Sequence, residues 1–148
     1  MLQKGNQAPD FSGVTQDNEP ITSNDYKGKK YVLFFYPKAG TPGCTAEACN
    51  LRDHHEALKE QGYHIIGVSA DPVVKQKKWA EKHHLSFPLI ADENKVLIKA
   101  FGVWGLKKFM GREYEGIHRT TFIINEEGII DEVITKVKTK EHTTQILK

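Results

Sequence analysis

The sequence predicts an α/β fold in which a central mixed β-sheet is flanked by helices, with an N-terminal β-hairpin extension. Short apolar segments alternate with segments of helical periodicity along most of the chain. The length of 148 residues, with 39% hydrophobic and 27% charged residues, is typical of one globular domain with a sizeable core. Because we find no internal repeat, linker or low-complexity tract, we expect a single domain spanning residues 1–148.

Buried strands account for the most apolar parts of the chain. Each is short, continuous and rich in Val, Ile and Phe, as strands covered on both faces are. We predict four of them, at residues 31–36, 64–70, 87–91 and 120–125. A fifth strand at 129–134 follows the sequence NEEG, which is typical of a hairpin turn. Residues 11–25 have the composition of an additional hairpin before the core.

Helices are expected between the strands. Residues 43–61 carry an apolar stripe at steps of three and four: Cys44, Ala48, Leu51, His55 and Leu58. Further helices are predicted at 71–84, 92–102 and 139–148. Asp71 and Pro72 suit the N-cap and first position of one of them, and Gly102 suits a C-terminal cap.

The charge balance points to no polyanionic partner. The net charge is +2, from 21 basic and 19 acidic residues, so we expect neither nucleic acid nor a membrane surface as a partner. The N-terminal sequence MLQKGNQAPDF does not resemble a signal peptide, and no run approaches the ~18 apolar residues of a membrane span. We therefore expect a cytoplasmic protein. We also expect a monomer, since no exposed apolar stripe is evident.

The two cysteines, Cys44 and Cys49, lie in the sequence PKAGTPGCTAEAC with four residues between them. A structural disulfide is disfavoured because cytosolic thiols are kept reduced and so short a loop adds little stability. A zinc site formed with His54 and His55 is disfavoured because ligands at this spacing on one helix do not converge on a tetrahedral metal. A reactive pair is favoured over both alternatives.

Cys44 is predicted to lie at the start of a helix, directly after a buried strand. Thr41 suits the N-cap and Pro42 the first helical position, which places Cys44 at about the third. Free backbone N–H groups and the positive end of the helix dipole stabilise a thiolate there. The end of a strand in an open α/β sheet is also a common ligand site. The alternative is that Cys44 is only a small buried apolar residue.

Cys49 lies five positions further along the same predicted helix. Ideal helix geometry separates the two α-carbons by roughly 8.6 Å and about 140° of rotation. A disulfide requires an α-carbon separation of roughly 4.4–6.8 Å. The two cysteines can therefore react with each other only if the first turns of the helix unwind.

Two segments of the chain resemble a known family, the peroxiredoxins, in the branch known as bacterioferritin comigratory protein or peroxiredoxin Q. The segment YPKAGTPGCTAEACNLRD matches the family pattern Pro-x-x-x-Thr-x-x-Cys at Pro37, Thr41 and Cys44, and Cys49 matches the position of a resolving cysteine. The later segment FGVWGLKKFMGREYEGIHRTTFIINEEG resembles the second family signature, in which Arg119 precedes a strand. The resemblance extends from GNQAPDF to the predicted hairpin. One departure is Ala39-Gly40, where many relatives carry acidic residues.

The resemblance implies a thioredoxin-like fold and the reduction of hydrogen peroxide and organic hydroperoxides. It implies an intramolecular disulfide between Cys44 and Cys49 that thioredoxin or a similar dithiol protein reduces, with no metal or organic cofactor. A thiolate is the nucleophile that attacks a peroxide oxygen, which leaves a sulfenic acid on Cys44.

Four further residues receive roles in this interpretation, each with a simpler alternative. Arg119 supplies a fixed positive charge for the thiolate and the peroxide, or is a surface salt-bridging residue. Thr41 positions the peroxide or only caps the helix. Pro37 shields the thiolate or only makes a turn. Glu47 orients Arg119 or Thr41, or is solvated.

Four aromatic residues near these segments are assigned to packing or to the pocket. Trp104 and Phe109 are expected in the core or at the pocket rim, and Phe35 and Tyr36 in the core or the pocket wall.

Two other functions stay open. One is a thiol–disulfide oxidoreductase of the thioredoxin type, although that chemistry uses Cys-x-x-Cys and Thr41 stands at the first position of the motif here. The other is a non-enzymatic redox sensor that uses Cys44 and Cys49 as a switch.

Overall fold

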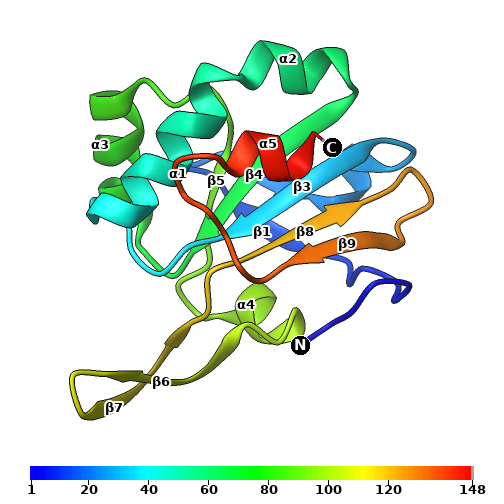
Figure 1. Cartoon of the computed structure of the whole chain (residues 1–148). Helices are drawn as coiled ribbons and strands as arrows, with labels where there is room; N and C mark the ends of the chain where they lie inside the picture. Colours follow the sequence, from blue (N-terminus) through cyan, green and yellow to red (C-terminus); the bar gives the residue numbers. More distant parts are fainter. Residues whose placement is uncertain (148) are drawn as a thin grey trace.

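The computed structural model of the chain describes residues 1–147 and contains a five-stranded sheet in the order β5-β4-β3-β8-β9 (Figure 1). The strands are β3 Lys30–Phe35, β4 Tyr63–Ser69, β5 Leu89–Ala91, β8 Thr120–Ile124 and β9 Ile130–Ile134. Strands β3, β4 and β5 are parallel, whereas β8 is antiparallel to both β3 and β9. The predicted central mixed sheet is confirmed.

Helices cover both faces of this sheet (Figure 1). One face packs against α1 Pro42–Asp53, α2 His55–Glu60, α3 Val73–His83 and α5 His142–Ile146. The other face packs against α4 Val96–Ala100 and the N-terminal segment. That segment forms the predicted hairpin from β1 Ser12–Val14 and β2 Pro20–Thr22, followed by the short 3-10 helix η1 Ser23–Tyr26.

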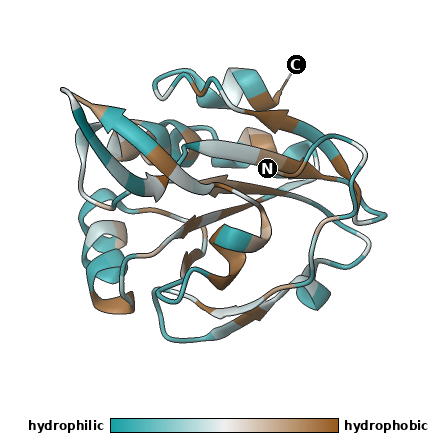
Figure 2. Cartoon of the chain, turned by 90° about the horizontal axis from the view of Figure 1, so that it is seen from below, coloured by the Kyte–Doolittle hydropathy of each residue, from teal (hydrophilic) through white to brown (hydrophobic). Residues whose placement is uncertain are grey.

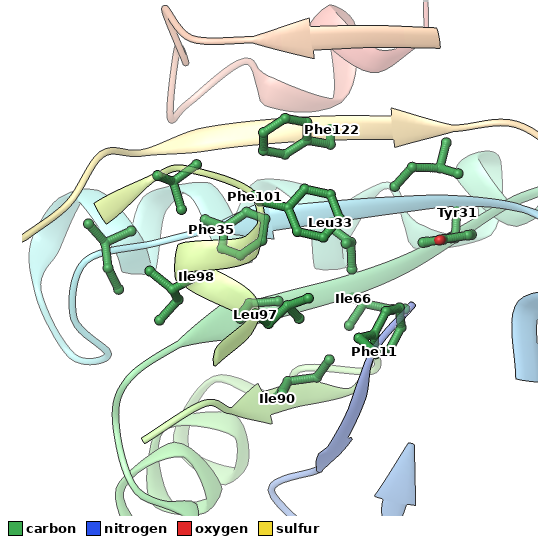
Figure 3. Packing of buried hydrophobic residues seen from close by; sticks show 14 of the residues in the cluster. Phe11, Tyr31, Leu33, Phe35, Ile66, Ile90, Leu97, Ile98, Phe101 and Phe122 are labelled. Atoms are coloured by element: carbon green, nitrogen blue, oxygen red, sulfur yellow. The ribbon is translucent and has the colours of Figure 1, made fainter. Parts of the chain in front are cut away.

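Strand β3 lies at the centre of the sheet and is apolar on both sides. Its successive side chains point to opposite faces, so Leu33 and Phe35 join the core under α4 while Phe34 joins the core under α1. Phe101 contacts both Phe35 and Phe122, with ring centroids 5.3 Å and 4.9 Å apart (Figure 3). In Figure 2 most peripheral loops are hydrophilic, and many hydrophobic residues lie on strands in the interior of the molecule.

Helix boundaries differ from the sequence predictions where backbone conformation changes locally. The helix expected over 43–61 is divided at His54, which adopts φ −112° and ψ 15°. The predicted N-cap Asp71 lies one residue too early, because Pro72 occupies the N-cap of α3. Lys95 has a positive φ of 58°, so the segment expected to begin a helix at residue 92 starts one only at Val96.

The ends of the last two predicted helices agree better with the structure. Gly102 follows α4 with a φ of 72°, as the predicted C-terminal cap requires. The helix expected over 139–148 is present as the shorter helix α5, which begins only at His142 and ends at Ile146, and Lys148 lies outside the described residues. Within residues 1–147, no helix combines the length and apolarity of a membrane span.

A hairpin that the sequence did not predict protrudes from the body of the molecule (Figure 1). It consists of β6 Trp104–Phe109 and β7 Arg112–Ile117, joined through Met110 and Gly111, which both have positive φ. Its exposed apolar side chains are Leu106, Phe109, Met110 and Tyr114. The expectation that no exposed apolar stripe exists is therefore wrong.

Of the two alternatives for Phe109, the core is excluded by its exposed fraction of 64%, and a place at the pocket rim stays a prediction. Trp104 packs partly against the core, and its indole N–H donates to Glu115 Oε2 at 2.9 Å. The sequence predictions looked for continuous apolar runs, which mark strands covered on both faces. The strands of this protruding hairpin are not covered in that way, so they lack such runs.

Candidate active site

Cys44 lies at the third position of α1, immediately after the loop that follows β3, as the sequence predicted. Pro42 is the first helical residue, and the Thr45 N–H donates to the Thr41 carbonyl at 2.9 Å in the first turn. The Cys44 side chain is fully buried, in the core between the sheet and α1. A thiol at a helix N-terminus lies near free backbone N–H groups and the positive end of the helix dipole.

Arg119 reaches Cys44 from the residue just before β8, the strand that pairs antiparallel with β3. It immediately precedes β8, whose first residue Thr120 pairs with Phe35 at the end of β3. The guanidinium donates from Nη2 to Cys44 Sγ at 3.4 Å and from Nη1 to Glu47 Oε1 at 2.8 Å. The structure thus brings together three of the predicted site residues.

Glycine at position 43 makes room for the guanidinium. A β-carbon at Gly43 would lie 3.1 Å from Nη2 of Arg119, which is tighter than an ordinary van der Waals contact. Arg119 therefore lies directly against the first turn of α1. Its side chain is 23% exposed, so this side of the site is in part accessible from solvent.

Glu47 is fully buried one turn after Cys44. The alternative that it is a solvated glutamate is therefore wrong, and of the two predicted partners it contacts Arg119. Burial raises the pKa of Glu47 to about 7, and the nearby Arg119 lowers it only in part. The carboxyl group is therefore poised between its two protonation states near neutral pH.

One cation contacts the Cys44 thiol, and a second interacts with it electrostatically without a contact. Burial lowers the pKa of Arg119, but the thiol of Cys44 and the Glu47 carboxylate outweigh this effect and raise it overall. Lys107, on the unpredicted hairpin, donates to the Ile117 carbonyl at 3.0 Å, and burial followed by the Arg119 charge lowers its pKa. Negative charge that develops on Cys44 or on a bound peroxide is thus matched from two elements.

The loop before α1 places Thr41 and Pro37. Thr41 occupies the predicted N-cap position, but its hydroxyl donates to the Lys38 carbonyl at 2.8 Å and makes no capping hydrogen bond. Pro37 is half-buried where the loop leaves β3. The Ala39 N–H donates to Asp71 Oδ2 at 2.7 Å, which fixes the loop to the end of β4.

Several polar residues around the site were missed as site residues by the sequence analysis. Asp71 was assigned to a helix cap, yet its carboxylate holds the loop and also accepts from Ser69 Oγ at 2.8 Å. Gln76 accepts from the hydroxyl of Tyr36, which is buried beneath α1. His142 contacts Glu47 from α5. Periodicity offered no signal for these residues, because each acts through a partner distant in the sequence.

Cys49 does not face Cys44. It is half-buried on the same uninterrupted helix, and both thiols are free. The next residue, Asn50, ties α1 to α5, since its amide donates to the Lys140 carbonyl at 2.9 Å and its carbonyl oxygen Oδ1 accepts from the Thr143 N–H at 2.8 Å. The segment between the two cysteines is therefore anchored at its C-terminal end.

A surface cavity of about 680 Å³ lies at the opposite end of the sheet. It is lined by residues of the N-terminal segment and of the β8–β9 turn, including Phe11, Tyr26 and Asn125. None of the residues near Cys44 lines it, so this cavity is separate from the thiol site.

Comparison with known proteins places these features in a family context. The family model described as the AhpC/TSA family matches residues 4–133. The chain is 47% identical over 147 residues to a protein of Bacillus subtilis named peroxiredoxin Bcp, covering 99% of this chain and 94% of the relative.

Solved structures give the same picture. The crystal structure of peroxidoxin BcpB from Mycobacterium tuberculosis superimposes with a TM-score of 0.87 at 33% identity, covering 99% of this chain and 95% of the other. A structure of the bacterioferritin comigratory protein of Xanthomonas campestris, described with an alkyl peroxide reduction activity, gives a TM-score of 0.86 at 31% identity and covers 93% of this chain and 87% of the other.

Proposed function

Because the chain belongs to the AhpC/TSA family and is a peroxiredoxin, a thiol peroxidase, we propose that Cys44 is its peroxide-reducing thiol and that Cys49 resolves the oxidised product as an intramolecular disulfide. The thioredoxin-like fold that the sequence resemblance implied is confirmed by the solved relatives. The substrates are peroxides and the reductant is a thiol.

One observation carries the proposal for Cys44. A buried thiol at the N-terminus of α1 accepts from the guanidinium of Arg119 at 3.4 Å, and that guanidinium is held in place by Glu47. A fixed cation and free backbone N–H groups around one sulfur stabilise a thiolate, which is the reactive form. Arg119 is partly exposed, so the same donors are available to the oxygens of an incoming peroxide.

The chemical step follows from this arrangement. The Cys44 thiolate attacks the distal oxygen of a hydroperoxide, an S–O bond forms and the O–O bond breaks. The sulfur is oxidised to a sulfenic acid, and the peroxide is reduced to an alkoxide that takes up one proton and leaves as an alcohol. With hydrogen peroxide the product is water. Arg119 stabilises the negative charge that moves from sulfur to the leaving oxygen.

The second step requires α1 to change conformation. The Cys49 thiol attacks the sulfenic sulfur, water leaves, and a disulfide forms between the two cysteines. Because both lie on one continuous helix, the turns between them must open first. The opened segment then presents the disulfide to a dithiol reductant, for which we propose thioredoxin or a similar protein. The monomeric state and the cytoplasmic location stay predictions.

The test is an assay in which NADPH consumption is coupled through thioredoxin and its reductase. We expect turnover with both hydrogen peroxide and a bulky organic hydroperoxide at catalytic protein concentrations. An insulin-reduction assay run in parallel identifies a thiol–disulfide oxidoreductase instead. Peroxide consumption limited to one equivalent, even with excess reductant, would favour the redox-sensor alternative.

A further inference from the structure

One oxygen of the buried Glu47 carboxyl group lacks a hydrogen-bond partner within residues 1–147. Oε1 accepts from Arg119, but Oε2 makes no hydrogen bond. His142 Nε2 on α5 lies 3.4 Å from Oε2, and both side chains are fully buried. Burying a carboxylate oxygen without a hydrogen-bond partner costs free energy, so a proton shared between Oε2 of Glu47 and Nε2 of His142 would stabilise the folded protein.

The tautomer of His142 follows from its other nitrogen. Nδ1 lies 2.8 Å from Gln145 Oε1. The amide of Gln145 cannot be reversed without losing contacts, because its nitrogen donates to the Lys136 carbonyl and its oxygen accepts from the Lys138 N–H, both at 2.9 Å. Nδ1 of His142 therefore carries a hydrogen and donates to Gln145.

This assignment leaves Nε2 as the titrating atom of His142. In the neutral ring, Nε2 accepts from the Thr121 hydroxyl, whose oxygen lies 2.7 Å away. Oε2 of an ionised Glu47 would then face a second acceptor. One added proton, on either Oε2 or Nε2, turns this contact into an interaction between a donor and an acceptor.

We propose that His142 is a positioning residue of the peroxidase site, which shares one proton with Glu47 and thereby controls how much of the Arg119 charge acts on Cys44. This inference rests on the proposed role of Cys44 and adds the C-terminal helix α5 to the site.

The charges around the pair explain the effect. Ionisable groups facing Glu47 are Cys44 on α1, Tyr36 after β3, Arg119 before β8 and His142 on α5. With the shared proton present, Glu47 and His142 are neutral in sum, and the Arg119 charge is left to the thiolate. Without it, the Glu47 carboxylate competes with the thiolate for the same guanidinium.

The proton is exchangeable near neutral pH. Burial raises the pKa of Glu47 to about 7. Burial lowers the pKa of His142, and the charge of Arg119 lowers it further, whereas the hydrogen bond to Gln145 raises it in part. The pair therefore changes its protonation in the range in which a cell works.

Gln145 provides a means to test the pair, because it contacts His142 on the side away from Glu47. In Gln145→Glu a carboxylate replaces the amide at Nδ1 and makes the imidazole more basic. We expect the pH at which the pair loses its proton to rise by about one unit, a tenfold gain in proton affinity. Infrared spectroscopy of the reduced protein follows the proton on both groups, through the protonated carboxyl band of Glu47 and the imidazolium bands of His142. Glu47→Gln and His142→Leu identify these bands by removing them.

The decisive comparison repeats Gln145→Glu in a His142→Leu background. There we expect no shift relative to His142→Leu alone, since the effect passes through the imidazole. His55→Leu is the matched control, because His55 is also buried and its Nδ1 lies 2.6 Å from the Ser86 hydroxyl, away from Glu47. An unchanged band in Gln145→Glu, or an equal shift without His142, would overturn the proposal.

The link to Cys44 is measured by the rate of thiol alkylation at pH 8 in the same variants. We expect Gln145→Glu to react faster than the wild type, because about half of its pairs keep the proton at that pH, compared with about a tenth in the wild type. An unaltered rate despite a shifted band would show that the pair does not act on Cys44. Neither measurement needs peroxide turnover, so failure of the proposed peroxidase function would be recognised separately in the coupled assay.

Discussion

Nη2 of Arg119 lies 3.4 Å from the sulfur of Cys44, although 75 positions separate the two residues in the chain. The antiparallel pairing of β8 with β3 produces this contact, because it places the residue before β8 beside the end of β3, where α1 begins. The charge that activates the thiol is therefore fixed by a sheet register, and a shift of the register would remove it.

Cys44→Ser should abolish peroxidase activity in the thioredoxin-coupled assay. A serine hydroxyl cannot form a sulfenic acid, and Cys49 is the only other thiol in the sequence. Cys49→Ser should behave differently and consume one equivalent of peroxide. Substantial turnover in Cys44→Ser would exclude Cys44 as the reacting residue.

Arg119→Met should slow both peroxide consumption and thiol alkylation of Cys44 at neutral pH. The methionine keeps much of the volume but removes the donor at Nη2, so the thiolate loses its closest cation. The expected loss in rate is about tenfold or more, equivalent to about 1.4 kcal/mol of transition-state stabilisation. Arg112→Met, on the exposed hairpin, is the matched control and should react as the wild type does. Equal alkylation rates in Arg119→Met and wild type would mean that Arg119 does not activate the thiol.

Oxidation should open the helix between the two cysteines. In the reduced protein the segment 44–49 lies within the continuous helix α1, and disulfide geometry is incompatible with that conformation. Amide hydrogen exchange should therefore show lower protection of residues 44–50 after one equivalent of peroxide, and no such change in Cys49→Ser. Equal protection in both redox states of the wild type would exclude the intramolecular disulfide.

Gly43→Ala should slow disulfide formation after the first oxidation. Alanine stabilises a helix by about 1 kcal/mol relative to glycine, which corresponds to about fivefold slower opening. The new β-carbon also presses on Arg119 at 3.1 Å. Trp79 fluorescence can follow the step, because its indole N–H donates to Thr45 Oγ1 in the first turn at 3.1 Å.

Ala46→Gly is the opposite change in the same helix and should accelerate the fluorescence step. If both variants resolve at the wild-type rate, opening of the first turns does not limit disulfide formation.

Glu47→Gln should become more stable relative to the wild type as the pH rises. Folding raises the pKa of Glu47 from 4.5 to about 7, so Glu47 binds its proton more tightly in the folded protein than in the unfolded chain. The resulting stabilisation is complete below pH 4.5 and is lost as the pH increases through about 7. Between pH 5 and pH 8.5 the difference in unfolding free energy should shift in favour of the variant by up to about 3 kcal/mol.

Urea denaturation of the reduced proteins at both pH values measures this difference. Glu56→Gln is the matched control, because Glu56 is exposed on α2. A constant difference between Glu47→Gln and the wild type would mean that Glu47 titrates normally in the folded protein.

The sequence by itself determined the features that depend on neighbouring residues. The order of the core strands and helices follows from apolar segments and helical periodicity, and the place of Cys44 follows from Thr41 and Pro42 just before it. Helix starts and strand burial are readable because they are set by groups a few residues apart.

The tertiary structure decided what distant elements impose on one another. Glu47 has the sequence of a surface glutamate, and only the packing of α5 and Arg119 around it makes it a buried, titrating group. Asp71 belongs to the site through Ala39, 32 positions away, and His142 belongs to it through Glu47 on another helix. The hairpin of β6 and β7 protrudes from the body of the molecule without a core beneath it. Protonation and orientation depend on desolvation and on contacts across the fold, and these exist only once the chain is packed.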